Sequence, residues 1–280
     1  MADQTILERP RADASVEASV NYVGPMSERP KFHAQDHSRD NLNLEPHVAP
    51  IHDARAMADA PTLEREGITL APHATKVADF RDAEAATPVY MAEVERLILD
   101  LTGATKVLVM GGAVLRYSKR SAHFGTGVNS QPAGFIHVDY TELSAPDLVS
   151  RSAGDEMRPG RRMAGYNIWR VVSQPPQDMP LAVCDARTIA DADLVRADAM
   201  FDVGEEPWWT FEAFLLRYNP AHRWLYYPDM RPDEALVFKS FETDPSQPVR
   251  VPHTAFENPL CPPDAPGRVS VEARAFAFFD

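Results

Sequence analysis

Cysteine is scarce in this sequence, which limits both the expected compartment and the expected chemistry. Only Cys184 and Cys261 occur in 280 residues, so no framework of disulfide bonds is indicated. Because disulfides belong to oxidising compartments, we expect this protein to work in the cytoplasm. Neither cysteine has a base beside it in the sequence, and no cysteine pair suggests a zinc site. Catalysis by a cysteine nucleophile therefore has no support.

Long apolar runs and an excess of positive charge are also missing. No segment approaches the roughly 20 apolar residues that cross a bilayer, and residues 1–4 lack the basic start of a signal peptide. The chain has 28 Lys and Arg against 41 Asp and Glu, a net charge of −13. A protein that binds nucleic acid needs a basic surface. We therefore expect neither a membrane nor a nucleic-acid partner, and the sequence leaves the oligomeric state open.

Several catalytic motifs are absent as well. The sequence contains no Gly-x-Ser-x-Gly, no P-loop and no His-Glu-x-x-His. Serine hydrolases of the nucleophile-elbow type, P-loop nucleotide hydrolases and helix-based zinc proteases are therefore disfavoured.

The chain divides into a polar beginning and a longer, more regular remainder. Residues 1–60 are rich in proline, aspartate, arginine and histidine and lack sustained periodicity. We interpret them as an extended arm with a few short strands at most, followed by a single domain over residues 61–280. The histidines of the arm have no partners at metal-binding spacing and are interpreted as surface residues: His33, His37, His47 and His52.

Three helices are expected. The clearest covers about residues 88–102, where Thr87 is a suitable N-cap, proline occupies the first helical position and Gly103 ends the helix. Its apolar residues follow the helical spacing, so one face is buried. Shorter helices are predicted near residues 145–152 and 190–200.

The rest of the regular structure is expected to be β. Short alternating or apolar runs are separated by turns rich in proline, which is typical of a mainly β protein with flanking helices and a jelly-roll or barrel core. The predicted strands are Lys106–Met110, Gly165–Val172, Leu181–Cys184, Phe211–Tyr218, Trp224–Tyr227, Ala235–Phe238 and Arg268–Phe279.

One strand carries an unusual pair of side chains. In Gly134–Tyr140 the sequence reads GFIHVDY, and it contains the chain's only His-x-Asp. Side chains alternate along a strand, so His137 and Asp139 point to the same face. They form either an ordinary buried hydrogen-bonded pair or two ligands of a metal site.

A third ligand is available at a distance. His253 lies in a strand-edge context, Arg250–Phe256. Two histidines and one carboxylate form the facial triad of non-haem Fe(II) oxygenases, which leaves positions open for oxygen and a cosubstrate. Zinc sites favour four protein ligands, or three and a water. Fe(II) bound by His137, Asp139 and His253 is therefore the preferred prediction.

The last predicted strand carries polar residues on one face. Arg268, Ser270, Glu272 and Arg274 alternate with apolar residues, and such a face inside a barrel is costly unless partners satisfy it. A guanidinium group binds a carboxylate through two parallel hydrogen bonds, which suits the distal carboxylate of 2-oxoglutarate. Arg274 would lie roughly 20 Å farther along the strand, so we expect it to pair with Glu272 or another acid.

Together these residues resemble the Fe(II)/2-oxoglutarate-dependent oxygenases. Five further blocks resemble a branch of small-molecule hydroxylases and desaturases that includes the gibberellin desaturases and a component of cephamycin methoxylation. The resemblance covers about residues 45–280. The blocks are Tyr166–Arg170, Pro180–Asp185, Trp224–Met230, Pro232–Lys239 and Val251–Phe256.

The resemblance implies a double-stranded β-helix core and roles for several side chains. Arg268 and Ser270 would bind the far carboxylate of 2-oxoglutarate, and Asn167 would hydrogen-bond this cosubstrate. The substrate would contact three more residues: Arg170, Trp169 and Tyr227. The strand Gly111–Arg116 lacks the polar, often Asp-His, pair expected before its arginine, so the role of that loop is left unassigned.

The resemblance also implies the reaction. Oxygen would convert 2-oxoglutarate to succinate and produce a ferryl species, which abstracts hydrogen from a small, secondary metabolite and leads to hydroxylation or desaturation. Asp139 fills the third ligand position, so halogenation is disfavoured. The alternatives are ring formation, epimerisation or oxygen insertion at the same iron, a non-catalytic partner subunit of the same fold, and a metal-binding jelly-roll that does not use 2-oxoglutarate.

Overall fold

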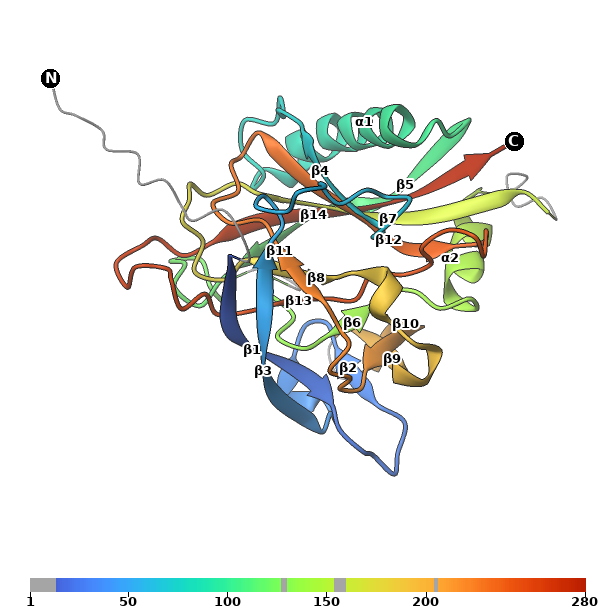
Figure 1. Cartoon of the computed structure of the whole chain (residues 1–280). Helices are drawn as coiled ribbons and strands as arrows, with labels where there is room; N and C mark the ends of the chain where they lie inside the picture. The colour runs from blue at the N-terminus through green and yellow to red at the C-terminus, as the bar shows by residue number, and fades with distance from the viewer. Residues whose placement is uncertain (1–13, 127–129, 154–159, 204–205) are drawn as a thin grey trace, which may run out of the picture.

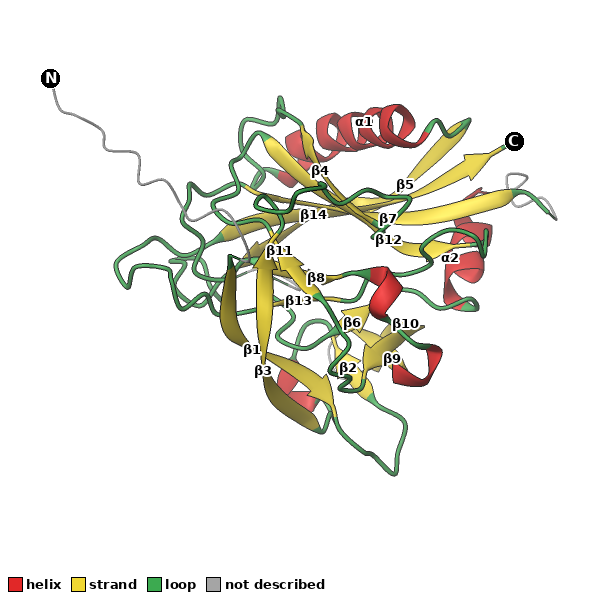
Figure 2. Ribbon diagram, in the orientation of Figure 1, coloured by secondary structure: helices red, strands yellow, loops and turns green. Residues whose placement is uncertain are grey.

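The alternating strands assemble into two sheets that face each other (Figure 1). The computed structural model describes residues 14–126, 130–153, 160–203 and 206–280. One sheet has five strands and the other nine, and Figure 2 shows the long helix α1 (Ala83–Thr102) covering the outer side of the five-stranded sheet. Among the described helices, none is long and apolar enough to cross a membrane.

Among the described strands most pairs are antiparallel, and the β3–β11 and β2–β9 pairs are parallel. In spatial order, the five-stranded sheet contains β4 (Ile68–Pro72), β12 (Glu234–Glu242), β7 (Arg162–Val171), β14 (Val269–Phe279) and β5 (Lys106–Tyr117). The nine-stranded sheet contains β1 (Ser15–Val23), β3 (Leu44–Asp53), β11 (Trp224–Tyr226), β8 (Leu181–Cys184), β13 (His253–Ala255), β6 (His137–Val138), β10 (Glu206–Leu216), β9 (Leu194–Val203) and β2 (Lys31–His33). The shorter helices are α2 (Ser144–Ala153), η1 (His37–Arg39), η3 (Ala186–Thr188) and η4 (Asp191–Asp193).

Strand β7 separates two hydrophobic layers. Tyr166 and Ile168 pack against Tyr90 of α1 on the outer side. Trp169 belongs to the cluster between the two sheets, with side chains from β8 and β12. This alternation follows from the two-residue period of a strand, and it places every second residue of β7 inside the jelly-roll, next to the site described below.

Helix α1 begins earlier than predicted. It starts at Ala83, with Asp82 as N-cap whose side chain accepts from the amide of Ala85, and it contains Pro88. The predicted start at residue 88 is therefore wrong. The cap at Asp82 satisfies an N-terminal donor, and a proline close to the N-terminus disturbs few helical hydrogen bonds. The predicted end is confirmed, because Gly103 caps the helix with φ of 67°.

The predicted helix over residues 190–200 is wrong, whereas the one near 145–152 is confirmed as α2. The short turn η4 is followed directly by strand β9, which pairs with β10 along its length. Ala197 and Ala199 are fully buried there. Alanine favours helices, but the ladder with β10 and this burial outweigh the local propensity.

Residues 1–60 contain more regular structure than predicted. Strands β1 and β3 are nine and ten residues long and pair along their whole length, and β3 also pairs with β11. The expectation of a few short strands at most is wrong. Val20 of β1 is buried while Ser19 faces outward, so the alternation of a strand is present in this sequence. Its partner β3 contains two prolines, which made a strand there harder to predict. The division of the chain at residue 60 stays a prediction.

Candidate metal centre

Three potential metal ligands meet where two short strands pair. His137 on β6 lies directly opposite His253 on β13, and their ring centroids are 4.2 Å apart. Asp139 follows β6 on the same side as His137. One ligand atom from each residue lies within 4.8 Å of the others. The structure thus brings together the three residues that the sequence predicted as metal ligands.

Both imidazoles are oriented by backbone carbonyl groups. Nδ1 of His137 lies 3.1 Å from the oxygen of Phe135, and Nδ1 of His253 lies 3.3 Å from the oxygen of Val251. If each Nδ1 carries the proton, each Nε2 is the available ligand atom. Burial lowers the pKa of His137 to about 3 and also lowers the pKa of His253. Both rings are therefore neutral near pH 7, and neutral imidazole is the form that binds metal ions.

The carboxylate of Asp139 has two different oxygens. Oδ2 accepts from Nδ2 of Asn167 and from Nε of Arg274, each at 2.7 Å. Oδ1 lies 3.6 Å from Nε2 of His137. Burial alone would raise the pKa of Asp139, but the positive charge of Arg274 lowers it below its usual value. Asp139 is thus ionised, with Oδ1 on the side of the imidazoles.

Arg268 lies at the other end of the same interior and lacks part of its expected bonding. Its side chain is 2% exposed, and Nη1 donates to Oγ of Ser270 at 2.5 Å. Among the described residues, none accepts a hydrogen bond from Nε or Nη2. Burial lowers the pKa of this guanidinium to about 10. A buried cation with unsatisfied donors is costly by itself, and a carboxylate ligand would satisfy both nitrogens.

A narrow cavity joins the two histidine ligands to Arg268. Its walls come from both sheets, so a bound molecule could contact the metal ligands and the arginine together. The lining residues are Arg116, Pro132, Ala133, His137, Trp169, Leu181, Phe238, His253, Thr254, Ala255, Arg268 and Glu272. This donor set, a facial triad followed by an unsatisfied guanidinium, fits Fe(II) and a dicarboxylate cosubstrate.

The predicted substrate residues have different positions. Trp169 lines the cavity, and the guanidinium of Arg268 lies 5.6 Å from the centre of its ring. Arg170 faces α1 instead, where its Nη2 donates to the backbone oxygen of His73. Tyr227 packs in the inter-sheet core but is not among the cavity-lining residues. The structure therefore brings only Trp169 of these three to the cavity.

Two further arginines belong to the site: the sequence predicted an acid partner for Arg274 and left the role of Arg116 unassigned. Arg116, on β5, lines the cavity, and its Nη2 lies 3.8 Å from Glu272. Arg274 pairs with Glu272, as expected, but also with the ligand Asp139. The signal for Arg274 was its place on the polar face of the last strand. The sequence could not identify Asp139 as the acid, because that contact joins residues far apart in the chain.

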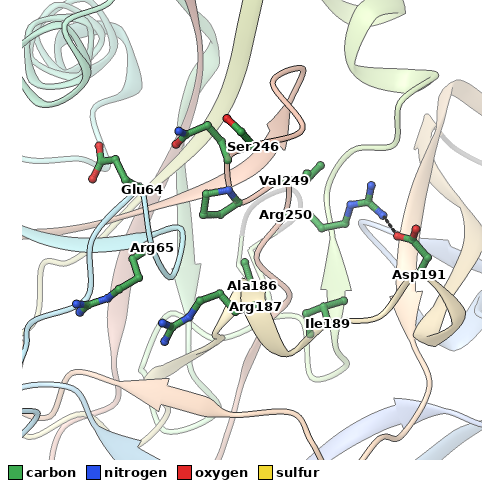
Figure 3. Close-up of a pocket in the computed structure, with 11 residues that line it drawn as sticks. Glu64, Arg65, Ala186, Arg187, Ile189, Asp191, Ser246, Val249 and Arg250 are labelled. Carbon is green, nitrogen blue, oxygen red and sulfur yellow. Dashed lines mark ion pairs between the residues drawn. The ribbon is translucent and has the colours of Figure 1, made fainter.

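A separate pocket of about 440 Å³ is shown in Figure 3. It contains none of the three metal ligands. Two of its arginines already have partners: Arg250 lies 3.6 Å from Asp191, and Arg187 lies 2.8 Å from Glu66. The cavity beside the triad is therefore the better candidate for the reaction site.

Comparisons with known proteins agree with this geometry. The model of a family described as "Oxidoreductase/YMDC permease-like domain" matches residues 20–278. The "Fe(II)/2-oxoglutarate-dependent dioxygenase nvfI" of Aspergillus novofumigatus (strain IBT 16806) is 30% identical over 245 residues, 85% of each chain. The "Hydroxylase/desaturase efuI" of Hormonema carpetanum is 30% identical over 264 residues, 87% of this chain and 86% of its own.

Solved structures give the same result. The structure of "iron and alpha-ketoglutarate-dependent endoperoxidase NvfI with different conformation" has a TM-score of 0.83 and 28% identity to this chain, and the match covers 95% of this chain and 98% of that one. The predicted double-stranded β-helix fold is confirmed by this likeness. With its His-Asp-His triad in place, the chain belongs to the Fe(II)/2-oxoglutarate-dependent dioxygenases.

Proposed function

We propose that this dioxygenase hydroxylates or desaturates a small, secondary metabolite, with His137, Asp139 and His253 binding Fe(II). The observation that carries the proposal is Arg268, a buried guanidinium in the same cavity as two of the ligands, with two nitrogens that no described residue accepts from. Such a group fits a carboxylate that arrives with the cosubstrate. When bound, Fe(II) and 2-oxoglutarate supply the oxidising chemistry that amino-acid side chains lack.

The protein's own part is to hold the reactants and exclude water. Arg268 and Ser270 would bind the far carboxylate of 2-oxoglutarate, and the indole of Trp169 would pack against the chain that joins its two ends. Nε2 of each histidine and Oδ1 of Asp139 would hold the metal, and a facial triad of this kind would leave positions for the cosubstrate and oxygen. Roles of Asn167 toward the cosubstrate, and of Arg170 and Tyr227 toward the substrate, stay predictions.

Apolar side chains, several of them half-buried, surround the residue that follows Asp139. Tyr140, directly after this ligand, packs in a cluster with Phe276 of β14. Half-buried side chains from β5, α2 and β10 pack on the same cluster: Leu108, Met110, Leu148 and Phe211. We propose that a largely apolar metabolite contacts these side chains, because such side chains gain free energy when a ligand covers them.

Two kinds of relatives support two outcomes of the reaction. The relative called a hydroxylase/desaturase and the resemblance to gibberellin desaturases and the cephamycin methoxylation component favour attack on a C–H bond. The relative called an endoperoxidase favours the alternative, in which the same iron site inserts oxygen. Ring formation and epimerisation are further alternatives that the same iron site would allow. Location in the cytoplasm stays a prediction from the cysteine content.

Spectroscopy in the absence of oxygen tests the proposal. Metal-free protein is titrated with Fe(II) and then with 2-oxoglutarate while the visible spectrum is recorded. A weak charge-transfer band that needs both additions is expected, because the cosubstrate then chelates the iron. His137→Ala should abolish the band. His47→Ala is a matched control, since His47 stacks on Tyr218 and is not one of the three ligands.

Two results would reject the proposal. If iron binds and no band appears with 2-oxoglutarate, the chain is a metal-binding jelly-roll that does not use this cosubstrate. If the band forms but no succinate is released with any tested metabolite in the presence of oxygen, a non-catalytic partner subunit becomes the better description. Intact ligands weigh against that second reading, since a subunit freed from catalysis need not keep all three.

A further inference from the structure

The carboxylate of Asp139 is held from outside the triad by two donors on one oxygen. Nδ2 of Asn167 and Nε of Arg274 both reach Oδ2 at 2.7 Å. Asn167 is on β7 and Arg274 on the neighbouring strand β14, where they lie directly opposite each other. The register of the five-stranded sheet therefore presents both donors to the same atom.

Arg274 is itself fixed from the other side. Its Nη2 pairs with Oε1 of Glu272, and Oε2 of Glu272 lies 3.8 Å from Nη2 of Arg116. The guanidinium thus bridges the carboxylates of Asp139 and Glu272. Arg274 stays protonated and has little freedom to turn away from Asp139.

We infer that Arg274, with Asn167, is a positioning residue that keeps Asp139 a monodentate metal ligand through Oδ1. With Oδ2 engaged by two donors, a second bond from this carboxylate to the metal would require breaking charge-assisted hydrogen bonds. With Asp139 contributing one oxygen, the site would keep a further coordination position for the cosubstrate or oxygen. Partners of this kind around metal ligands typically change metal affinity by about 10–100-fold when removed.

The inference rests on the proposed iron site, and the experiment separates the two. Binding of Mn(II), a redox-stable substitute for Fe(II), is measured by electron paramagnetic resonance in wild-type protein and in His137→Ala. If the wild type shows no site that His137→Ala removes, the proposed function fails. If that site is present, Arg274 can be tested on it.

Arg274→Met should weaken Mn(II) binding by about 10–100-fold, and Asn167→Ala should weaken it less, because the charged donor remains. The visible spectrum of bound Co(II) should change in Arg274→Met, since Oδ2 is then able to join the metal, and Arg274→Lys should restore part of the affinity. Arg162→Met is the matched control, because Arg162 pairs with Glu242 through a half-buried guanidinium.

The outcome that overturns the inference is equally definite. Arg274→Met that binds Mn(II) as tightly as the wild type and gives an unchanged Co(II) spectrum would show that Asp139 needs no help from this side chain. Should Arg274→Met fail to fold, Asn167→Ala and Arg274→Lys provide the same comparison. Equal weakening by Arg162→Met would assign the effect to general loss of stability.

Discussion

Arg268 is a buried side chain whose hydrogen-bond donors are only partly satisfied by the described residues. Its Nη1 donates to Ser270, whereas Nε and Nη2 have no hydrogen-bond partner in the described part of the chain. Hydrogen bonds to a charged group contribute about 1.5–3 kcal/mol. Arg268→Ala should therefore raise the Kd for 2-oxoglutarate about 10–100-fold, measured by calorimetry on Mn(II)-loaded protein.

Two further variants sharpen this test. Arg268→Lys keeps the charge but not the planar fork, so it should lose part of the affinity. Ser270→Ala should have a smaller effect, because this hydroxyl supports Arg268 without carrying charge. If Arg268→Ala bound 2-oxoglutarate as tightly as the wild type, another residue would have to anchor the far carboxylate.

Arg170 presents the opposite case, a buried arginine that the sequence placed near the substrate. Its side chain lies between β7 and α1, bonded to His73 and over the ring of Tyr90. Arg170→Met should therefore lower the free energy of unfolding by about 2–3 kcal/mol in urea, and the Kd for 2-oxoglutarate should not change. Unchanged stability with a changed KM for a substrate would instead support the predicted contact.

For single residues of the site, residue type and spacing in the sequence were the main basis of the prediction. The sequence could predict four residues of the site, because strand alternation and the few known sets of metal ligands restrict which side chains can act together: His137, Asp139, His253 and Arg268. The hydrogen bond from Arg274 to Asp139 could not be predicted from the sequence, because this contact depends on which strands become neighbours in the fold. Local sequence defines a side chain's face on a strand, but the partner across a sheet is set by the fold.

Side-chain hydrogen bonds link Tyr22 on strand β1 to residues on other strands and turns. Nδ1 of His222 lies 3.1 Å from the hydroxyl of Tyr22, its Nε2 lies 3.1 Å from Asp193, and Trp224 donates to the same hydroxyl at 2.9 Å. Burial lowers the pKa of His222 below its ordinary value of 6.5, and Asp193 offsets this only in part. The folded protein therefore holds this ring in its neutral form.

This cluster predicts a dependence of stability on pH. Between pH 6.5 and the lower pKa of the folded state, the unfolded chain binds the proton more readily, so the contribution of His222 to stability is complete above pH 6.5 and is lost as pH falls. The loss is at most about 1.4 kcal/mol per pH unit. In urea, the destabilisation caused by His222→Asn should be smaller at pH 5.5 than at pH 7.5.

The free energy of unfolding must be compared between His222→Asn and the wild type, because the pKa values of other histidines are also lowered in the folded protein. Burial lowers the pKa of His73 and of His253 too, so the wild type alone would report their sum. An equal effect of His222→Asn at both pH values would mean that His222 titrates alike in the folded and unfolded chain. His123→Asn provides a control at a more exposed histidine.

Elements were predicted well where one signal dominated and poorly where two competed. The end of α1 was correct because Gly103 adopts a positive φ that glycine favours. Its start was misplaced because Pro88 looks like a first helical residue. Residues 190–200 contain good helix formers, yet they pair with β10, and such a tertiary ladder cannot be seen in a local window.

For the whole molecule, the largest difference from the sequence-based picture is the N-terminal pair β1 and β3. Together with side chains from β8, β10 and β11 they close a hydrophobic cluster that contains Val16, Val20 and Trp224. The amide of Ile136, one residue before the ligand His137, donates to the backbone oxygen of Asn21. The N-terminal strands thus contact the segment that carries the first metal ligand.

This arrangement predicts that the N-terminal strands and the metal centre unfold together. Val20 is 1% exposed and Ser19 is its outward-facing neighbour, so Val20→Asp should lower the free energy of unfolding by about 3–5 kcal/mol, whereas Ser19→Asp should change it little. Calorimetry should show one transition that moves as a whole in Val20→Asp, and Mn(II) should raise its midpoint in the wild type. A residual transition at the wild-type temperature, still raised by Mn(II), would mean that residues 61–280 fold without the arm. The boundary predicted at residue 60 would then be a real division of the chain, and β1 and β3 an attachment that the metal centre does not require.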